Sequence, residues 1–189
     1  MTVAAVHQAG YYGKIPSLGD FCVRNLPPDF VTPWDNWLRA ALGHVRRSIE
    51  DDLAWRQMFL SSPVWRFVLA AGVCGPTGWT GVIGPGSDKV GRFFPLTIVL
   101  PLPPETDVAH LVTRWQDGYR AAEDLLLASL DNGYDADTLA AAVEGWRLSM
   151  AVPHRTAPAG NRFLGESPMV QVPLGMDGEK GVGAAISTA

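Results

Sequence analysis

Two glycine-rich stretches carry charged side chains in a pattern that is typical of functional loops. One runs from Gly10 to Phe21, and the other from Gly84 to Arg92. Glycine and proline give the backbone shapes that other residues avoid, so such loops hold their polar side chains in fixed positions. The polar residues of these stretches, together with one that braces them from the following helix, are Lys14, Ser17, Asp20, Asp35, Ser87, Asp88, Lys89 and Arg92. We take these as candidate site residues, which either bind a partner or hold the loops in shape.

Catalysis by these residues would need groupings that the sequence lacks. The four histidines lie in different predicted elements without the spacing of metal ligands, and no Gly-x-Ser-x-Gly pattern marks a hydrolase nucleophile. Asp20 and Asp88 would act as a carboxylate pair only if their loops met in space. We therefore expect no enzyme activity, no cofactor and no metal ion.

The second loop has the composition of a phosphate-binding loop but not its order. A Walker loop carries Gly-Lys-Ser/Thr at the start of a helix, whereas Asp88 directly precedes Lys89 here and a strand is predicted next. An ion pair of Asp88 with Lys14 or Arg92 is the favoured interpretation. The alternative is that Lys89 and Arg92 bind an anion.

Composition narrows the function further. A chain of 189 residues, 47% of them hydrophobic, is enough for one globular domain. The net charge of -4, without a run of Lys or Arg, predicts no binding to nucleic acid. Two cysteines in no metal spacing favour a reducing compartment. The sequence has no signal-peptide pattern, and no apolar run approaches the roughly 20 residues of a membrane span. We expect a cytoplasmic protein that does not insert into membranes.

The elements that must position the loops are predicted from hydrophobic periodicity. A strand over 6–12 precedes the first loop. Thr32-Pro33 has the pattern of a helix start, after a Pro27-Pro28 pair that is expected to prevent regular structure, and the helix is predicted to end at Asp51 or Asp52. Trp34 and Trp37 lie on its apolar face, so both are expected in the core.

Sheet and helix patterns then follow in turn. A short helix is predicted over 53–60, strands over 64–74, 79–83 and 93–102, and long helices over 107–130 and 137–150, with two further strands over 170–174 and 182–186. Trp65 and Phe67 lie in the first of these strands, and both are expected in the hydrophobic core. No repeat or linker divides the chain. We assign 1–153 to one α/β domain and 154–189 to a C-terminal segment that is packed on it or partly flexible.

Six segments of the sequence, taken in order, form a recognisable pattern. They are Tyr12-Gly13-Lys14-Ile15-Pro16-Ser17, Gly19-Asp20-Phe21, Trp34-Asp35-x-Trp37-Leu38, Ser62-Pro63-Val64-Trp65-Arg66-Phe67, Gly78-Trp79-Thr80-Gly81-Val82 and Ser87-Asp88-Lys89-Val90-Gly91-Arg92-x-Phe94-Pro95-Leu96-Thr97. In this order they resemble the TagF (ImpM) family of type VI secretion-associated proteins. The sequence after Pro153 departs from the family, because it lacks the expected final strand with a tryptophan.

The resemblance implies both a fold and a function. The fold is a single-domain α/β/α sandwich with a mostly antiparallel or mixed sheet and three main helices, in agreement with the elements predicted above. The implied function is negative regulation of type VI secretion after translation, through the forkhead-associated scaffold protein of that system. Some relatives are fused to a Ser/Thr phosphatase domain, for which this chain has no room. Any link to a phosphatase or kinase pathway would therefore involve a separate protein.

The leading hypothesis is a non-enzymatic regulator whose binding surface is formed by the two loops. A first alternative is that the loop charges bond one another and that the binding surface lies elsewhere. A second is a small-ligand or anion-binding sensor or enzyme, with a pocket between the loops of residues 13–20 and 84–92.

Overall fold

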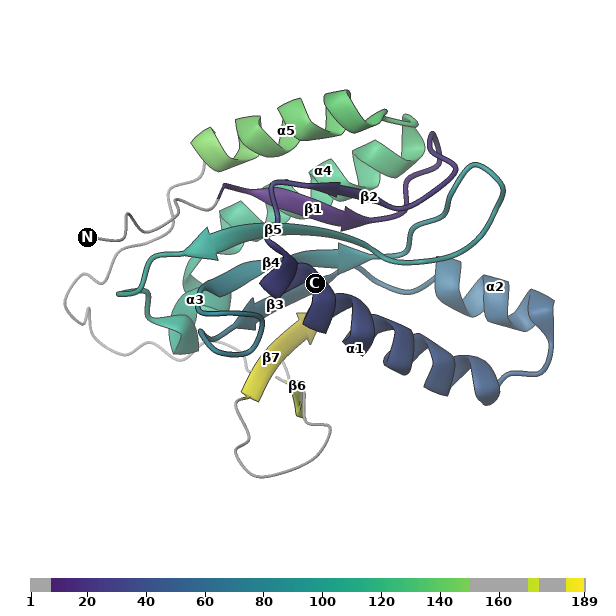
Figure 1. Ribbon diagram of the computed structural model, residues 1–189, viewed down its shortest axis with the longest axis horizontal. Coiled ribbons are helices and arrows are strands. Elements are labelled where there is room, and N and C mark those ends of the chain that lie inside the picture. The colour runs from purple at the N-terminus through teal and green to yellow at the C-terminus, as the bar shows by residue number, and fades with distance from the viewer. Residues whose placement is uncertain (1–7, 150–169, 174–182, 189) are drawn as a thin grey trace.

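The computed structural model contains a seven-stranded sheet, with layers of helices on its two sides and with β7 and β6 extending it at one edge (Figure 1). The structure describes residues 8–149, 170–173 and 183–188. Along the chain the elements are β1 (Gly10–Gly13), β2 (Cys22–Arg24), α1 (Pro28–Arg47), α2 (Asp52–Leu60), β3 (Trp65–Leu69), β4 (Gly78–Gly84), β5 (Leu96–Leu102), α3 (Val108–Arg114), α4 (Gln116–Asp131), α5 (Ala136–Ser149), β6 (Val170–Pro173) and β7 (Gly183–Thr188). The strand order is β2-β1-β5-β4-β3-β7-β6, and every neighbouring pair is antiparallel.

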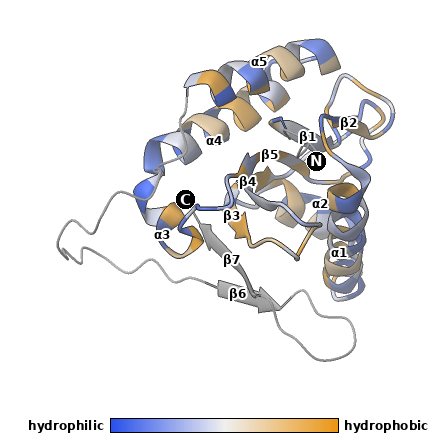
Figure 2. Cartoon of the chain, turned by 60° about the vertical axis from the view of Figure 1, so that its left-hand side comes forward, coloured by the Kyte–Doolittle hydropathy of each residue, from blue (hydrophilic) through white to orange (hydrophobic). Residues whose placement is uncertain are grey.

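Over β1–β5, both faces of the sheet carry buried apolar residues and both are covered by helices. Successive strand residues point to opposite faces, so Ile98 of β5 packs with α3, α4 and α5, whereas its neighbour Val99 packs on the side of α1. The two helical layers lie on opposite sides of the sheet in Figures 1 and 2, and the strands between them contain many hydrophobic residues. The predicted α/β/α sandwich is therefore confirmed, with α1, α4 and α5 as its three long helices.

Strand register brings the two glycine-rich loops together. β4 and β5 pair from Gly78 opposite Leu102 to Gly84 opposite Leu96, so the second loop connects their ends. β1 pairs with β5, which places Gly13 beside the point where the second loop enters β5. Gly13 has a φ of 143°, and a Cβ there would lie 2.0 Å from the carbonyl oxygen of Pro95. Only glycine fits this close approach.

The start of α1 was predicted wrongly. The helix begins at Pro28 rather than near Pro33, and it ends at Arg47. Pro28 stands in the first turn, where a missing N–H costs nothing, but Pro33 lies inside the helix and removes one backbone hydrogen bond. The additional turn buries Phe30 completely, with its ring 4.8 Å from that of Trp79. This packing outweighs the proline signal.

The predicted helix over 107–130 is two helices, α3 and α4. They are separated at Trp115, whose φ of −109° and ψ of 40° are not helical. The Trp115 indole lies against Gly118, where a Cβ would be 2.1 Å from the ring, and it also contacts Tyr119 and Trp146. The break in the helix allows this aromatic packing.

The other differences lie mainly at strand ends. β3 stops at Leu69, because Gly72 and Gly75 have positive φ and close a turn there. β5 starts at Leu96 rather than Phe93, and the short strand β2 was not predicted. Residues 1–7 lie outside the described residues, and they include the first two residues of the strand predicted over 6–12. Strands predicted over 170–174 and 182–186 are present as β6 and β7.

Candidate functional site: a loop clamp and an apolar groove

Asp88 joins the two glycine-rich loops. Its side chain is fully closed to solvent, and Oδ2 accepts hydrogen bonds from Lys14 Nζ at 2.9 Å and from Arg92 Nε at 2.7 Å. Oδ1 accepts from the backbone N–H groups of Val90 at 3.1 Å and Arg92 at 2.9 Å. We call Lys14, Asp88 and Arg92 the loop clamp. Asp88 thus has both of the cationic partners that the sequence offered.

The loop clamp controls the ionisation of Asp88. Burial alone would raise the pKa of this carboxyl group. The opposing hydrogen bonds, from the Arg92 backbone and from the Lys14 and Arg92 side chains, are stronger in sum and hold the pKa well below its usual value. Asp88 is consequently a charged structural anchor.

Further bonds hold the first loop in place. The Lys89 backbone N–H donates to the carbonyl oxygen of Leu18 at 2.8 Å, and Arg92 Nη2 donates to that of Gly19 at 2.6 Å. Ser17 Oγ donates to the Tyr134 carbonyl oxygen at 2.7 Å, which ties this loop to the α4–α5 connection. The two loops and this connection therefore form one hydrogen-bonded unit.

The remaining candidate residues have separate environments. Asp20 accepts from the backbone N–H of Phe21 at 2.8 Å, so Asp20 and Asp88 have different partners. Ser87 bridges to Phe93 across the base of the second loop. Lys89 is exposed, and it makes no ion pair with any residue that the structure describes.

Asp35 braces β1 against α1. It accepts a short hydrogen bond from the Tyr12 hydroxyl and a second bond from Arg39 Nε at 2.6 Å. Burial, and then the hydrogen bond to the Asp35 carboxylate, raise the pKa of Tyr12. The Tyr12 ring packs with those of Phe21 and Phe94, so β1, the end of the first loop and the segment just before β5 meet at one aromatic cluster.

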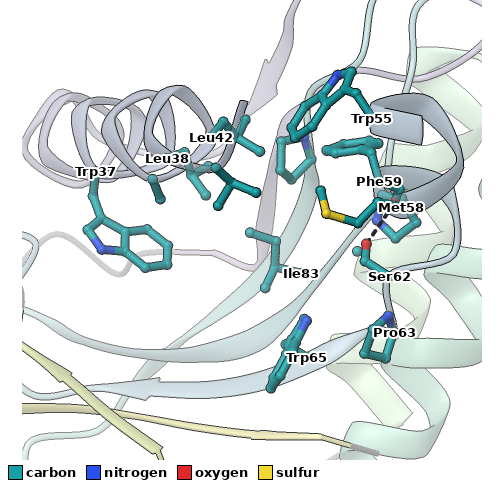
Figure 3. A pocket seen from close by; sticks show the side chains of 15 residues that line it. Trp37, Leu38, Leu42, Trp55, Met58, Phe59, Ser62, Pro63, Trp65 and Ile83 are labelled. Atoms are coloured by element: carbon teal, nitrogen blue, oxygen red, sulfur yellow. Dashed lines mark hydrogen bonds between the residues drawn. The ribbon is translucent and has the colours of Figure 1, made fainter. Parts of the chain in front are cut away.

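Sequence reasoning missed an apolar groove between α1, α2 and the adjoining ends of β3 and β4 (Figure 3). Its volume is about 570 Å³. The lining consists almost wholly of apolar side chains, namely Trp37, Leu38, Ala41, Leu42, Val45, Trp55, Met58, Phe59, Ser62, Pro63, Trp65, Ile83, Gly84, Pro85 and Pro95. The one hydroxyl group among them, that of Ser62, donates to the Phe59 carbonyl oxygen at 2.7 Å. We call this feature the apolar groove.

Three tryptophans give the apolar groove the character of a binding surface. Trp37, Trp55 and Trp65 are half-buried and line it from three different elements. Their indole N–H groups have no hydrogen-bond acceptor in the part of the chain that the structure describes. Trp37 and Trp65 are thus not core residues in the way that Trp34 and Phe67 are. Tryptophan, which has an apolar ring and one polar N–H group, is enriched at protein interfaces.

The composition of α2 could have indicated this surface. Asp51 caps the helix by accepting from the backbone N–H groups of Leu53 and Ala54. The helix is apolar on several sides, and Leu53, Met58 and Leu60 remain exposed, by 60%, 39% and 51%. A helix that is apolar all round is normally covered. An exposed one therefore indicates an interaction surface.

In the part of the chain that the structure describes, neither the cysteines nor the possible metal ligands form a further site. Cys22 and Cys74 are buried free thiols, and burial raises the pKa of each to about 11. Such thiols are unreactive. Within the described ranges, the His, Cys, Asp and Glu side chains form no group of three that could hold a metal ion. No helix among these residues has the length and apolar character needed to cross a membrane.

The segment that carries both the loop clamp and the apolar groove also matches a known family. Residues 10–145 match the model of the TagF N-terminal domain, which is type VI secretion system-associated. The chain belongs to the TagF family. The resemblance noted in the sequence is therefore confirmed, and the match runs from β1 into α5, so it includes every candidate residue.

A solved structure agrees with this assignment. The TagF chain is similar to PA0076 from Pseudomonas aeruginosa PAO1, with 35% sequence identity and a TM-score of 0.67. The similarity covers 82% of this chain and 67% of PA0076. None of the curated proteins matches this chain.

Proposed function

We propose that this TagF-family protein is a non-enzymatic negative regulator of type VI secretion that acts after translation by binding the forkhead-associated scaffold protein of that system. The association with type VI secretion comes from family membership. The observation that carries the binding role is the apolar groove, with three half-buried tryptophans and the exposed Met58 beside it. Binding energy at protein interfaces is concentrated in such aromatic anchors.

The loop clamp has a structural role in this proposal. Asp88 is closed to solvent and engaged by two cations and two backbone N–H groups. Arg92 Nε donates to Asp88 and Nη2 donates to Gly19, so these two donors are already engaged within the protein and are not available to a bound anion. These contacts therefore indicate that the loop clamp holds the two loops in shape. They do not favour the alternative of a small-ligand pocket between the loops. The partner surface then lies at the apolar groove.

The proposed site of action is the cytoplasm. Two buried free thiols fit a reducing compartment. Forkhead-associated domains recognise phosphorylated motifs through Arg clusters. A connection to a Ser/Thr kinase or phosphatase would then act through the scaffold, and the TagF-family chain would contribute no catalytic group.

Co-purification from the host tests this function. Tagged wild-type protein should retain the forkhead-associated protein, and its overproduction should lower the secreted amount of a type VI substrate. Met58→Glu places a charge in the apolar groove at an exposed position, so it should abolish both effects while the melting temperature is preserved. Leu127→Glu is the matched control, because Leu127 is an exposed apolar residue on α4, across the sheet. Failure of the wild-type protein to retain the scaffold, or equal retention by Met58→Glu, would contradict the proposal.

A further inference from the structure

The shape of the apolar groove defines what can fill it. At a rise of about 1.5 Å per residue, the α1 wall from Trp37 to Val45 is about 12 Å long. Residues at positions i, i+4 and i+7 of a partner helix span about 10.5 Å by the same measure, so two helical turns match this wall. Ala41 is the smallest side chain on the α1 wall, and it leaves space into which a partner side chain can pack.

The backbone around the apolar groove disfavours an extended peptide. β3 is already paired with β4 and β7, and β4 is paired with β3 and β5, so neither strand has a free edge for β-augmentation. Pro63, Pro85 and Pro95 contribute no backbone N–H groups to the lining. A bound extended chain would find few partners for its main chain, whereas a helix satisfies its own hydrogen bonds.

The charge at one side of the apolar groove indicates the sign of the charge expected on the partner. The guanidinium of Arg56 lies 5.4 Å from the centre of the Phe93 ring, and the Phe93 ring lies 5.4 Å from that of Phe59, which lines the groove. Arg56 makes no ion pair with a described residue. By contrast, Arg46, which lies over the ring of Trp55, is neutralised by Asp52. The Arg56 cation over Phe93, which no described acidic residue neutralises, therefore favours an acidic flank on the partner.

We propose that the apolar groove binds an amphipathic α-helix of a partner protein, with large apolar residues at i, i+4 and i+7 and acidic residues on the flank that faces Arg56. The helix places its apolar side chains between Trp37, Met58 and Trp65. This inference rests on the proposed function only in taking the apolar groove as the binding surface. It does not depend on which protein carries the helix.

Selection from a displayed library of random 16-residue peptides, carried out on the full chain, tests the inference. The expected peptides have the i, i+4, i+7 apolar spacing with Glu or Asp on one flank, and they show helical circular dichroism when bound. Truncating a hot spot typically costs at least about tenfold in affinity, and we expect Met58→Glu to lower the affinity by this much. Ala41→Phe, which fills the groove without adding charge, is a second blocking variant, and Leu127→Glu is the control with unchanged binding.

Charge reversal tests the acidic flank. Arg56→Glu should weaken the selected peptides, and exchange of their flanking Glu residues for Lys should restore binding to this variant. Pro-rich or lysine-flanked peptides that compete for the groove would overturn the inference. It would equally be overturned by the absence of any peptide that depends on Met58, or by a concentration-dependent dimer that Met58→Glu dissociates, since the occupant would then be a second copy.

The two proposals fail separately. The selection uses no component of the secretion system, so helical acidic peptides can bind the groove even where the forkhead-associated protein does not co-purify. That outcome would reject the proposed scaffold and keep the helix. Co-purification that Met58→Glu abolishes, without any groove-dependent helical peptide, would reject the helix and keep the scaffold.

Discussion

Lys14 and Asp88, which are 74 positions apart in the chain, form a 2.9 Å ion pair whose two side chains are almost wholly closed to solvent. Burying two charges costs solvation energy that their attraction recovers only with good geometry and further hydrogen bonds. Asp88 receives those bonds from Arg92 and from two backbone N–H groups. The pair therefore specifies how the two loops dock, which is the role expected of a fully satisfied buried network.

Removing Asp88 should destabilise the fold. Asp88→Ala leaves the buried Lys14 ammonium group without its carboxylate and removes acceptors from the Val90 and Arg92 backbone. A buried pair broken on one side is strongly destabilising, so we expect the melting temperature to fall by at least about 5 °C. Thermal unfolding followed by circular dichroism measures this. An unchanged melting temperature, with the substitution verified, would mean that the loop clamp does not stabilise the protein.

Acid should reduce the stability that the charged Asp88 side chain contributes to the fold. The folded-state pKa of Asp88 lies below the ordinary value of 3.8, so its contribution to stability is fully present above that pH and is lost as the pH falls below it. Asp135 and Glu144 shift in the same direction, so the wild type must be compared with Asp88→Asn. The difference in the free energy of unfolding between the two proteins should stay constant from pH 7 to about pH 5 and shrink below about pH 4. Urea titrations at each pH measure this difference. A difference that grows on acidification would contradict the assignment.

Gly13→Ala should be far more costly than another substitution at positive φ. A Cβ at Gly13 meets the Pro95 carbonyl oxygen at 2.0 Å, whereas one at Gly72, where φ is 95°, meets nothing within 4 Å. Backbone strain alone costs about 1–3 kcal/mol, so Gly72→Ala should lie in that range. Gly13→Ala adds a steric clash of about 1–3 kcal/mol more. Urea unfolding of the two variants measures the difference. Equal losses would show that β1 and β5 separate easily at this point.

The sequence predicts the layers of this fold better than its irregular points. Alternating and helical periodicity located the main strands and helices, because burial on two sheet faces imposes those periods. The start of α1 was missed because the burial of Phe30 compensates for Pro33. The break at Trp115 was missed because it depends on a contact with Trp146, which is distant in the chain.

Local chemistry likewise predicts the loop clamp better than the apolar groove. The charge pattern of the loops pointed to a pair of Asp88 with Lys14 or Arg92, and both pairs exist. The apolar groove instead arises where two helices and two strand ends leave a space. Apolar residues that line such a space have the same pattern as core residues, so Trp37 could not be distinguished from Trp34. Only the apolar composition of α2 carried a signal.

The buried pair of Arg66 and Glu123 should show a large coupling. Arg66 forms two bonds with Glu123 and a further one with Gln116, under the ring of Tyr119. Glu123→Ala should destabilise the protein by about 3 kcal/mol, because it leaves the guanidinium buried and unpaired. The double variant Arg66→Met with Glu123→Leu should unfold within about 1 kcal/mol of the wild type. Denaturant unfolding of Arg66→Met, Glu123→Leu and the double variant measures the coupling, and additive losses would contradict it.

Reversal of two exposed cations distinguishes the apolar groove from the loops as the partner surface. Arg56 and Lys89 both lie at the surface without an ion pair among the described residues, but Arg56 packs on Phe93 beside the apolar groove, whereas Lys89 lies on the second loop near Gly19. Rim charges act mainly on association rate and salt dependence. We therefore expect Arg56→Glu to slow association with the forkhead-associated protein by about tenfold at low salt, with a smaller effect at high salt. Lys89→Glu should leave the rate within about twofold, because Lys89 lies on the second loop beside Gly19 and does not line the apolar groove. Stopped-flow or surface-plasmon measurements at two salt concentrations compare the variants.

The opposite order, in which Lys89→Glu is the slower variant, would contradict this prediction. It would assign the interface to the glycine-rich loops and leave the apolar groove without a role in this complex.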